Sequence, residues 1–142
     1  MPTLIEEKFK FKVGDIAVVG RWDRVDVTPE GAVIIDYKSS EVQEQSAANK
    51  RTRESLQLHI YALAWHALHG ELPARAELRF LETGLVGQAS FSLKDLERTT
   101  QVIRDTASGI RAREFIATPE EFTCRWCAFQ AICPFAFQAP LH

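Results

Sequence analysis

The amino-acid sequence predicts an α/β fold in which a mixed central sheet is flanked by helices. Segments with the alternation of strands lie both before and after a segment with helical periodicity, and a second helical segment follows. The 142 residues suit one domain, and 46% hydrophobic and 25% charged residues suit one globular core. We therefore expect a single core with one active site at most.

Three strands are expected in the first quarter of the chain. Residues 8–13 alternate apolar and basic side chains, residues 16–27 continue an extended pattern, and residues 32–37 form a short apolar run. Turn residues separate these segments at Gly14 and at residues 29–31. The three strands are predicted to be joined by tight turns.

A polar loop and a long helix are expected next. Residues 39–50 offer almost nothing to bury, which predicts a mobile loop. Residues 52–69 carry apolar side chains at spacings of three and four, and Gly70 stands where a helix would end. We expect one helix over this segment.

Two more strands and a second helix are expected in the second half. Residues 76–80 and 86–91 predict two strands joined by a short turn. Ser92 followed by Asp95 resembles a capping box, and it opens a helix whose apolar residues fall one heptad apart. The regular pattern ends after Phe115.

Charge and hydropathy exclude several classes of protein. Lys and Arg number 17 against 19 Asp and Glu, so the net charge of −2 lacks the basic excess of a protein held to nucleic acid by charge alone. Any such binding must be local. No apolar run approaches the roughly 20 residues of a membrane span, and residues 1–12 are too charged for a signal peptide. A cytoplasmic protein without a membrane partner is expected.

Two acids and a lysine are predicted to meet at the end of the first sheet. Asp36 and Lys38 lie two residues apart on one predicted strand, so they point to one face while Tyr37 points to the other. If the strand that contains Asp23 pairs with this strand, two carboxylates and an ammonium converge. The alternative is an ordinary salt bridge between Asp36 and Lys38, with Asp23 capping a turn.

A divalent cation would compensate the charge of such a cluster. Charged groups at the inward end of apolar strands are costly unless they are paired or bind a cation. Mg2+ is usually held by one or two carboxylates, keeps waters and contacts phosphate oxygens. Bound by Asp23 and Asp36, it would lower the pKa of a water and orient a phosphodiester. Lys38 would position that water or stabilise the transition-state charge.

Three motifs carry a resemblance to a known family. They are Gly-Arg-Trp-Asp-Arg-Val-Asp at residues 20–26, Ile-Ile-Asp-Tyr-Lys at residues 34–38 and Gln-Leu-His-Ile-Tyr at residues 57–61. In order and spacing they resemble the motifs of the RecB-like branch of the PD-(D/E)XK nucleases. The resemblance implies a restriction-endonuclease-like fold.

The resemblance also implies roles for the cluster residues. In this family, the acids that correspond to Asp23 and Asp36 bind Mg2+ or Mn2+. The residue at the position of Tyr37 adds its backbone carbonyl to the metal, and the lysine at the position of Lys38 assists the water.

Gln57 and Tyr61 lie on the predicted helix that follows. Because they are four residues apart, they share one helix face and can both look towards the sheet end. The resemblance places both in the active-site wall and in contact with DNA. The alternative is that Tyr61 is a core aromatic and Gln57 a solvated residue.

All three cysteines lie near the end of the chain. Cys124, Cys127 and Cys133 are an odd number, which favours a metal or cluster site over a disulfide framework. We expect a nuclease core over residues 1–116 and a cysteine-rich tail over residues 117–142. The resemblance implies a [4Fe-4S] cluster with one cysteine ligand missing from this chain. Zinc with an outside ligand and three reduced, packed cysteines are the alternatives.

Two departures from the family pattern concern ligands that the family takes from upstream residues. No cysteine precedes Cys124, and no histidine precedes His59. Both absences would be explained if these 142 residues are the C-terminal part of a longer polypeptide or a reduced version of the domain. A helicase domain or subunit is then an expected partner.

Basic residues flank the predicted site. Lys50, Arg51 and Arg53 precede the helix of Gln57, and Arg24 follows the first acid. Phosphate contacts need positive charge near an acidic metal site, because the carboxylates alone repel the substrate. We expect these four cations to contact DNA; the alternative is that they are simply solvated.

We therefore expect a metal-dependent DNA nuclease domain that hydrolyses phosphodiester bonds. Its expected role is that of an exonuclease, or the processing of single strands or ends, in DNA repair or recombination. The alternative is a catalytically inactive DNA-binding or scaffold module of a larger helicase-nuclease.

Overall fold

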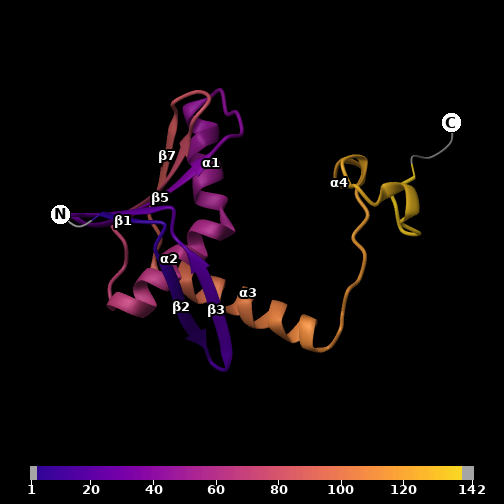
Figure 1. The fold of residues 1–142 in the computed structure, drawn as a ribbon, viewed down its shortest axis with the longest axis horizontal. Helices are drawn as coiled ribbons and strands as arrows, with labels where there is room; N and C mark the ends of the chain where they lie inside the picture. The colour runs from indigo at the N-terminus through magenta and orange to yellow at the C-terminus, as the bar shows by residue number, and fades with distance from the viewer. Residues whose placement is uncertain (1–2, 139–142) are drawn as a thin grey trace. The chain divides into compact units, whose positions relative to one another are not determined.

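The computed structural model describes residues 3–138 and divides the chain into two compact units, up to Ala107 and from Ser108 onwards (Figure 1). The helices that begin in the first unit are α1 (Gln45–Glu54), α2 (Leu56–His69) and α3 (Leu93–Arg111). The strands of the first unit are β1 (Thr3–Ile5), β2 (Lys8–Val13), β3 (Ile16–Arg21), β4 (Arg24–Thr28), β5 (Gly31–Lys38), β6 (Arg75–Phe80) and β7 (Val86–Ala89).

The five-stranded central sheet confirms the predicted mixed α/β architecture. Its strand order is β1-β4-β5-β6-β7, with β5 and β6 parallel and every other pair antiparallel. The β5 to β6 connection contains α1 and α2, because parallel neighbours require a crossover. The mixed sheet is thus built around the strand that carries Asp36.

The N-terminal strands differ from the prediction in two ways. Residues 16–27 do not form one strand: β3 ends at Arg21, and β4 begins at Arg24 in a different sheet. The strands β2 and β3 form a separate antiparallel hairpin, paired from Lys8 with Arg21 to Val13 with Ile16. Strand β1 was not predicted, because three residues are too few to display an alternating pattern.

One face of the central sheet packs on a hydrophobic core. Ala32 and Ile34 of β5, Val25 of β4 and Leu58 of α2 belong to one buried cluster, which also contains the inner side chains of β2. The core therefore lies between the sheet, α2 and the hairpin. A buried strand end on this side holds the polar residues of the candidate site.

The opposite face of the sheet carries a network of paired charged side chains. Glu77 on β6 is buried and accepts hydrogen bonds from Arg75 and Arg79. Arg24 donates two hydrogen bonds of 2.8 Å to Asp26 on β4. These paired charges cover the apolar side chains of β5 that point to this face.

Helix α1 replaces much of the predicted loop at residues 39–50. Its sequence lacks an apolar stripe, and only Ala48 and Thr52 are buried. Its stability comes from close packing on β7, where a Cβ on Gly87 would collide with the backbone of Ala48. Gln45 Nε2 also donates to the carbonyl of Val86, at 2.8 Å. The helix thus depends on contacts with a strand that comes much later in the chain.

The helix predicted over residues 52–69 begins instead at Leu56, after a break at Ser55. Ser55 is extended, and its hydroxyl accepts the Leu58 amide, which caps α2. The predicted end of this helix is confirmed, since Gly70 has a φ of 76° in the left-handed region that favours glycine. Helices α1 and α2 are therefore separate elements.

The capping box that opens α3 is also confirmed. The Ser92 amide donates to Asp95 Oδ2 at 2.8 Å, and the Asp95 amide donates to Ser92 Oγ at 3.3 Å. Leu96 and Thr99 are the buried residues of this helix. The apolar stripe is thus covered over the first turns of α3.

The second unit contains little regular structure. It holds the short helix α4 (Glu121–Arg125) and the 3-10 turn η1 (Gln130–Ile132). None of the described residues from 111 to 138 is buried. Within residues 3–138, no helix is long and apolar enough to cross a membrane.

Candidate active site

Asp23 lies where the chain passes from the hairpin to the central sheet. The Glu6 amide donates to the Asp23 carbonyl and the Trp22 amide donates to the Glu7 carbonyl, both at 3.0 Å, so this link is fixed by backbone hydrogen bonds. The Asp23 Oδ2 atom accepts the amide of Tyr37 at 3.1 Å. The first predicted acid is therefore anchored directly on β5.

Asp36 is buried at the end of β5, with only 2% of its surface exposed. Burial raises the pKa of its carboxyl, the nearby Asp23 raises it further, and Lys38 opposes the rise. Lys38 Nζ lies 2.7 Å from Asp36 Oδ2, but no described residue donates an aligned hydrogen bond to that oxygen. We regard the contact as an ion pair that leaves Oδ2 without a directed donor.

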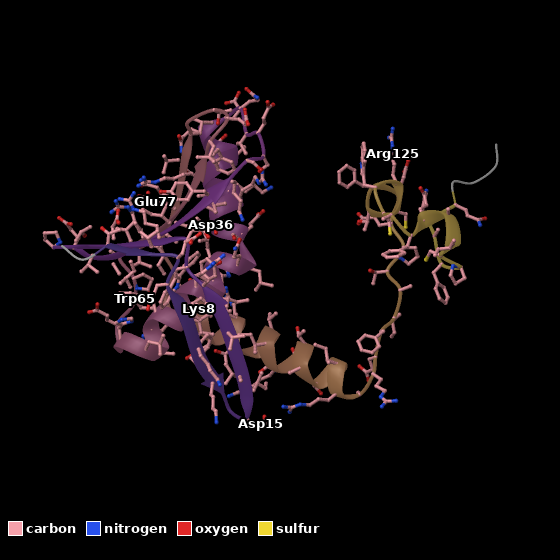
Figure 2. The ribbon with its side chains drawn as sticks, in the orientation of Figure 1. Lys8, Asp15, Asp36, Trp65, Glu77 and Arg125 are labelled. Carbon is pink, nitrogen blue, oxygen red and sulfur yellow. The ribbon has the colours of Figure 1, made fainter. Side chains whose placement is uncertain are left out.

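Lys38 links the acids to α2. Its ammonium donates to Gln57 Oε1 at 2.7 Å, and Gln57 Nε2 donates to the Tyr61 hydroxyl at 2.9 Å. The predicted convergence of Asp36, Lys38 and the shared helix face is thus present as geometry. Asp36 and Glu77 lie on neighbouring strands of the sheet (Figure 2).

Tyr61 is both a core aromatic and part of the site wall. Its ring meets that of Phe9 edge to face at 5.7 Å, and its backbone carbonyl accepts Trp22 Nε1 at 3.3 Å. Burial is the main cause that raises the pKa of its phenol, whereas Arg21 opposes the rise. The hydroxyl nevertheless reaches Gln57, so the two interpretations of Tyr61 are compatible.

The donor set fits a hard divalent cation. Asp23 and Asp36 supply carboxylate oxygens, which are the ligands that hard divalent cations prefer, and Asp36 Oδ2 contacts the Lys38 ammonium without an aligned hydrogen-bond donor. Within residues 3–138, no three acidic, histidine or cysteine side chains gather closely enough to hold a metal ion. A cation here would therefore use backbone and water oxygens besides the two carboxylates.

The four basic residues expected to contact DNA have different surroundings. Arg24 is held by Asp26, on the charged face of the sheet. The Arg51 guanidinium lies 5.3 Å from the centre of the Phe80 ring, in a cation–π contact. Lys50 and Arg53 are exposed on α1. The structure therefore does not gather these four cations into one cluster.

The cysteines lie in the second unit. Cys127 is exposed, whereas Cys124 and Cys133 are partly buried, and all three are free thiols. Cys124 Sγ accepts the amide of Phe137 at 3.3 Å. Within residues 3–138, the three thiols do not lie close enough together to form a set of metal ligands. The alternative of three reduced, packed cysteines does not match the structure, because Cys127 and the neighbouring Phe122 and Trp126 are exposed.

Sequence reasoning missed one residue that shapes the site. Trp22 is buried, and its ring lies tilted by 43° against the Phe9 ring, with centres 4.8 Å apart, which fixes the residue before Asp23. Trp22 lies inside the Gly-Arg-Trp-Asp motif, but its place before the first acid does not show that its side chain enters the core.

Comparison with known structures identifies the fold. The chain resembles the protein in a structure titled "Crystal structure of SSO0001", with a TM-score of 0.61 and 18% sequence identity. The match covers 96% of this chain and 62% of the other, so the chain spans less than two thirds of that protein. No curated protein matches the chain significantly.

The mixed sheet with flanking helices is a restriction-endonuclease-like fold. Residues 1–134 match the PD-(D/E)XK nuclease superfamily, and the chain belongs to that superfamily. Its members are nucleases that typically use divalent metal ions.

Proposed function

We propose that the chain is a metal-dependent deoxyribonuclease domain of the RecB-like branch. It cleaves phosphodiester bonds as an exonuclease or in single-strand or end processing, in DNA repair or recombination. The observation that carries this proposal is the buried Asp36, whose Oδ2 lacks a directed donor and faces both Asp23 and Lys38. Superfamily membership supports the reaction class.

Asp23, Asp36 and the backbone carbonyl of Tyr37 are the proposed ligands of Mg2+ or Mn2+. The bound ion supplies a water of lowered pKa and positive charge for the phosphate oxygens. The protein holds the two carboxylates in place through the Tyr37 amide and the burial of β5. Hard oxygen donors of this kind suit a cation that keeps part of its water shell.

Lys38 is the proposed group that orients the attacking water and stabilises charge on the phosphate. Asp36 and Gln57 hold its ammonium from two sides, each at 2.7 Å, so its position is fixed before substrate arrives. Gln57 is in turn held by the Tyr61 hydroxyl. Gln57 and Tyr61 therefore act as the wall that positions Lys38 and faces the DNA.

The proposed substrate and partners are those of a DNA-processing enzyme. Lys50, Arg51 and Arg53 lie on α1 in the crossover that leads to Gln57, which supports phosphate contacts near the site. Arg24 would contribute only when a phosphate competes with Asp26 for its guanidinium. A helicase domain or subunit and a cytoplasmic location complete the proposal.

The tail is proposed to take a [4Fe-4S] cluster or zinc through Cys124, Cys127 and Cys133, with the fourth ligand from elsewhere. Three free thiols within ten residues of each other support this proposal. Three thiolates leave a four-coordinate site one ligand short, so the fourth ligand would come from another segment of the chain or from a partner. Anaerobic purification followed by an absorption spectrum and metal analysis tests it.

Cleavage of a labelled single-stranded oligonucleotide with Mn2+ or Mg2+ tests the nuclease proposal. Asp23→Asn, Asp36→Asn and Lys38→Ala should each reduce cleavage by at least about 100-fold, because each removes a charge that acts on the reacting phosphate. Exposed residues of α3 provide matched controls, Asp105→Asn for the acids and Lys94→Ala for the lysine. Full activity in all three site variants would refute the assignment.

One observation favours a second function, that of an inactive DNA-binding or scaffold module. Only two carboxylates meet at the site, and no third acidic, histidine or cysteine ligand joins them within the described residues. Such a module would retain DNA without cleaving it at any concentration of divalent metal. The same oligonucleotide assay therefore separates the two functions.

A further inference from the structure

The outer face of the β2–β3 hairpin carries a row of positive charges. Lys8, Lys10 and Lys12 alternate with the buried residues of β2, and Arg21 lies opposite Lys8 on β3. All four are exposed, and side chains on one face of a strand repeat at roughly 7 Å. We call these four residues the basic stripe.

No acid interrupts the basic stripe. The other outward residues of the hairpin are Ala17 and Val19, which are uncharged. Glu7 precedes β2 and Asp15 lies in the turn, so acidic residues are confined to the two ends. The ion pairs that Arg24, Lys38, Arg75, Arg79 and Arg98 form with acids all lie outside the stripe. This local excess is notable in a chain whose net charge is −2.

The basic stripe begins at the candidate active site. Arg21 is the last residue of β3, two residues before Asp23, and it pairs with Lys8 at that end of the hairpin. Figure 2 shows Lys8 at the end of the hairpin nearer Asp36 and Asp15 at the opposite tip. The stripe therefore leads away from the acids along the full length of the hairpin.

The surface between the cations is hollowed and partly apolar. A hollow of about 500 Å³ is lined by Lys8, Lys10, Val19 and Arg21 together with the adjoining hairpin residues. Val19, one of the lining residues, is 68% exposed. A nucleotide combines a charged phosphate with an apolar sugar and base face, and this surface offers both kinds of contact.

We propose that the basic stripe binds the phosphate backbone of single-stranded DNA and guides it to the acids of the site. This inference rests on the nuclease function proposed above and adds a binding surface to it. Lysines also protect exposed strand edges from pairing with other chains, which is a different explanation for their presence. That role requires no connection to the active site and predicts no effect on DNA affinity.

Binding of a fluorescein-labelled single-stranded oligonucleotide in EDTA tests the proposal independently of cleavage. The test variant is Lys10→Gln with Lys12→Gln, which spares the two cations nearest the site. Loss of two phosphate contacts should make the negative slope of log K against log salt shallower by about 1.4. It should also weaken the affinity at 0.1 M salt by roughly 25-fold. The double variant Lys10→Arg with Lys12→Arg should keep the wild-type affinity.

The matched control is Lys94→Gln with Arg104→Gln, which removes the same charge from exposed positions on α3. It should change affinity by less than about twofold, because these positions are not part of the stripe. Equal losses in the two double variants, or no loss in the hairpin variant, would overturn the proposal. Aggregation of the hairpin variant with unchanged affinity would assign the lysines to edge protection instead.

Two further outcomes separate this proposal from the nuclease assignment. If stripe-dependent binding persists while Mn2+ supports no cleavage, the nuclease assignment fails and the binding surface stands. If cleavage occurs but neither binding nor cleavage depends on Lys10 and Lys12, the binding surface fails alone. Competition by polyglutamate as strong as that by unlabelled oligonucleotide would exclude nucleic acid as the specific occupant.

Discussion

Asp36 keeps its carboxylate in a place where water hardly reaches it. Burial and the neighbouring Asp23 both favour the protonated form, and the single ion pair with Lys38 only partly offsets them. A residue of this kind destabilises the fold when it is charged. Its presence is explained by a ligand that needs the charge, which is the proposed cation.

Asp36→Asn should stabilise the metal-free protein at neutral pH. The raised pKa means that ionisation of Asp36 opposes folding, so the wild type loses stability as pH rises above the usual value of 3.8 and through the folded pKa. We expect the variant to melt higher by a few degrees at pH 7, for a gain of about 1 kcal/mol, and by less at pH 4. Thermal unfolding in EDTA followed by circular dichroism measures both.

Asp26→Asn is the matched control for this prediction. Arg24 holds the pKa of Asp26 below its usual value, so ionisation of Asp26 favours folding above pH 3.8. Its removal should lower the melting temperature at pH 7, the opposite sign to Asp36→Asn. A wild type that is more stable than Asp36→Asn at pH 7 without metal would contradict the account.

The convergence of Asp23, Asp36 and Lys38 could be predicted because it follows from strand alternation and one strand pairing. The link through Gln57 follows from helix periodicity in the same way. The burial of Trp22 and the commitment of Arg24 to Asp26 could not be predicted. They depend on which face each residue takes when β3 and β4 enter different sheets.

Elements with their own periodic apolar pattern were predictable, whereas α1 was not. The segments that became α2, β5 and β6 each bury a recognisable stripe or run. Helix α1 has no such stripe and is held by polar contacts with β7, including the Gln88 amide that donates to Asn49 Oδ1 at 3.1 Å. Tertiary packing decided its conformation.

Gly87→Ala should destabilise the protein by about 1–3 kcal/mol, because an added methyl would overlap the backbone of Ala48 and the hydroxyl of Thr52. Urea unfolding followed by circular dichroism measures the change. The same substitution at Gly109 in α3 is the control, since no side chain or backbone crowds that position. It should stabilise the helix by up to about 1 kcal/mol. Equal effects at both positions would contradict close packing of α1 on β7.

Asp95→Asn should weaken the start of α3 by about 1 kcal/mol at pH 7. Hydrogen bonds from Ser92 lower the pKa of the Asp95 carboxyl, so its contribution is present above the usual value of 3.8 and is lost as pH falls through the folded pKa. Melting temperatures of wild type and variant should therefore converge in acid. A gap that persists at pH 2 would show that the charge of Asp95 is not what stabilises the cap.

At the scale of the whole molecule, the order of the elements predicted a mixed sheet flanked by helices. It did not predict that the strands divide between a five-stranded sheet and a separate hairpin. Strands β2 and β3 of the hairpin and β4 of the five-stranded sheet come from segments that look alike in sequence, since each carries apolar residues in an extended pattern. The separation is set by Trp22, which leaves the strand and enters the core. Nothing local in the sequence shows that departure.

A chain that ends at residue 116 should keep the fold of the first unit. No described residue from 111 to 138 is buried, so their removal takes little apolar area out of the core. We expect the melting temperature to change by less than about 5 °C and unfolding to remain cooperative. Differential scanning calorimetry of the two chains measures both. Loss of cooperativity would show that the core extends beyond residue 116.

The three tryptophans give the protein built-in optical reporters. Trp22 and Trp65 are 2% and 4% exposed and lie with ring centres 5.9 Å apart, whereas Trp126 in the second unit is 74% exposed. The buried pair should emit at shorter wavelength than Trp126 and resist quenching by iodide. Because Trp22 adjoins Asp23, we expect binding of the proposed divalent cation to change the short-wavelength emission, so a titration needs no added label.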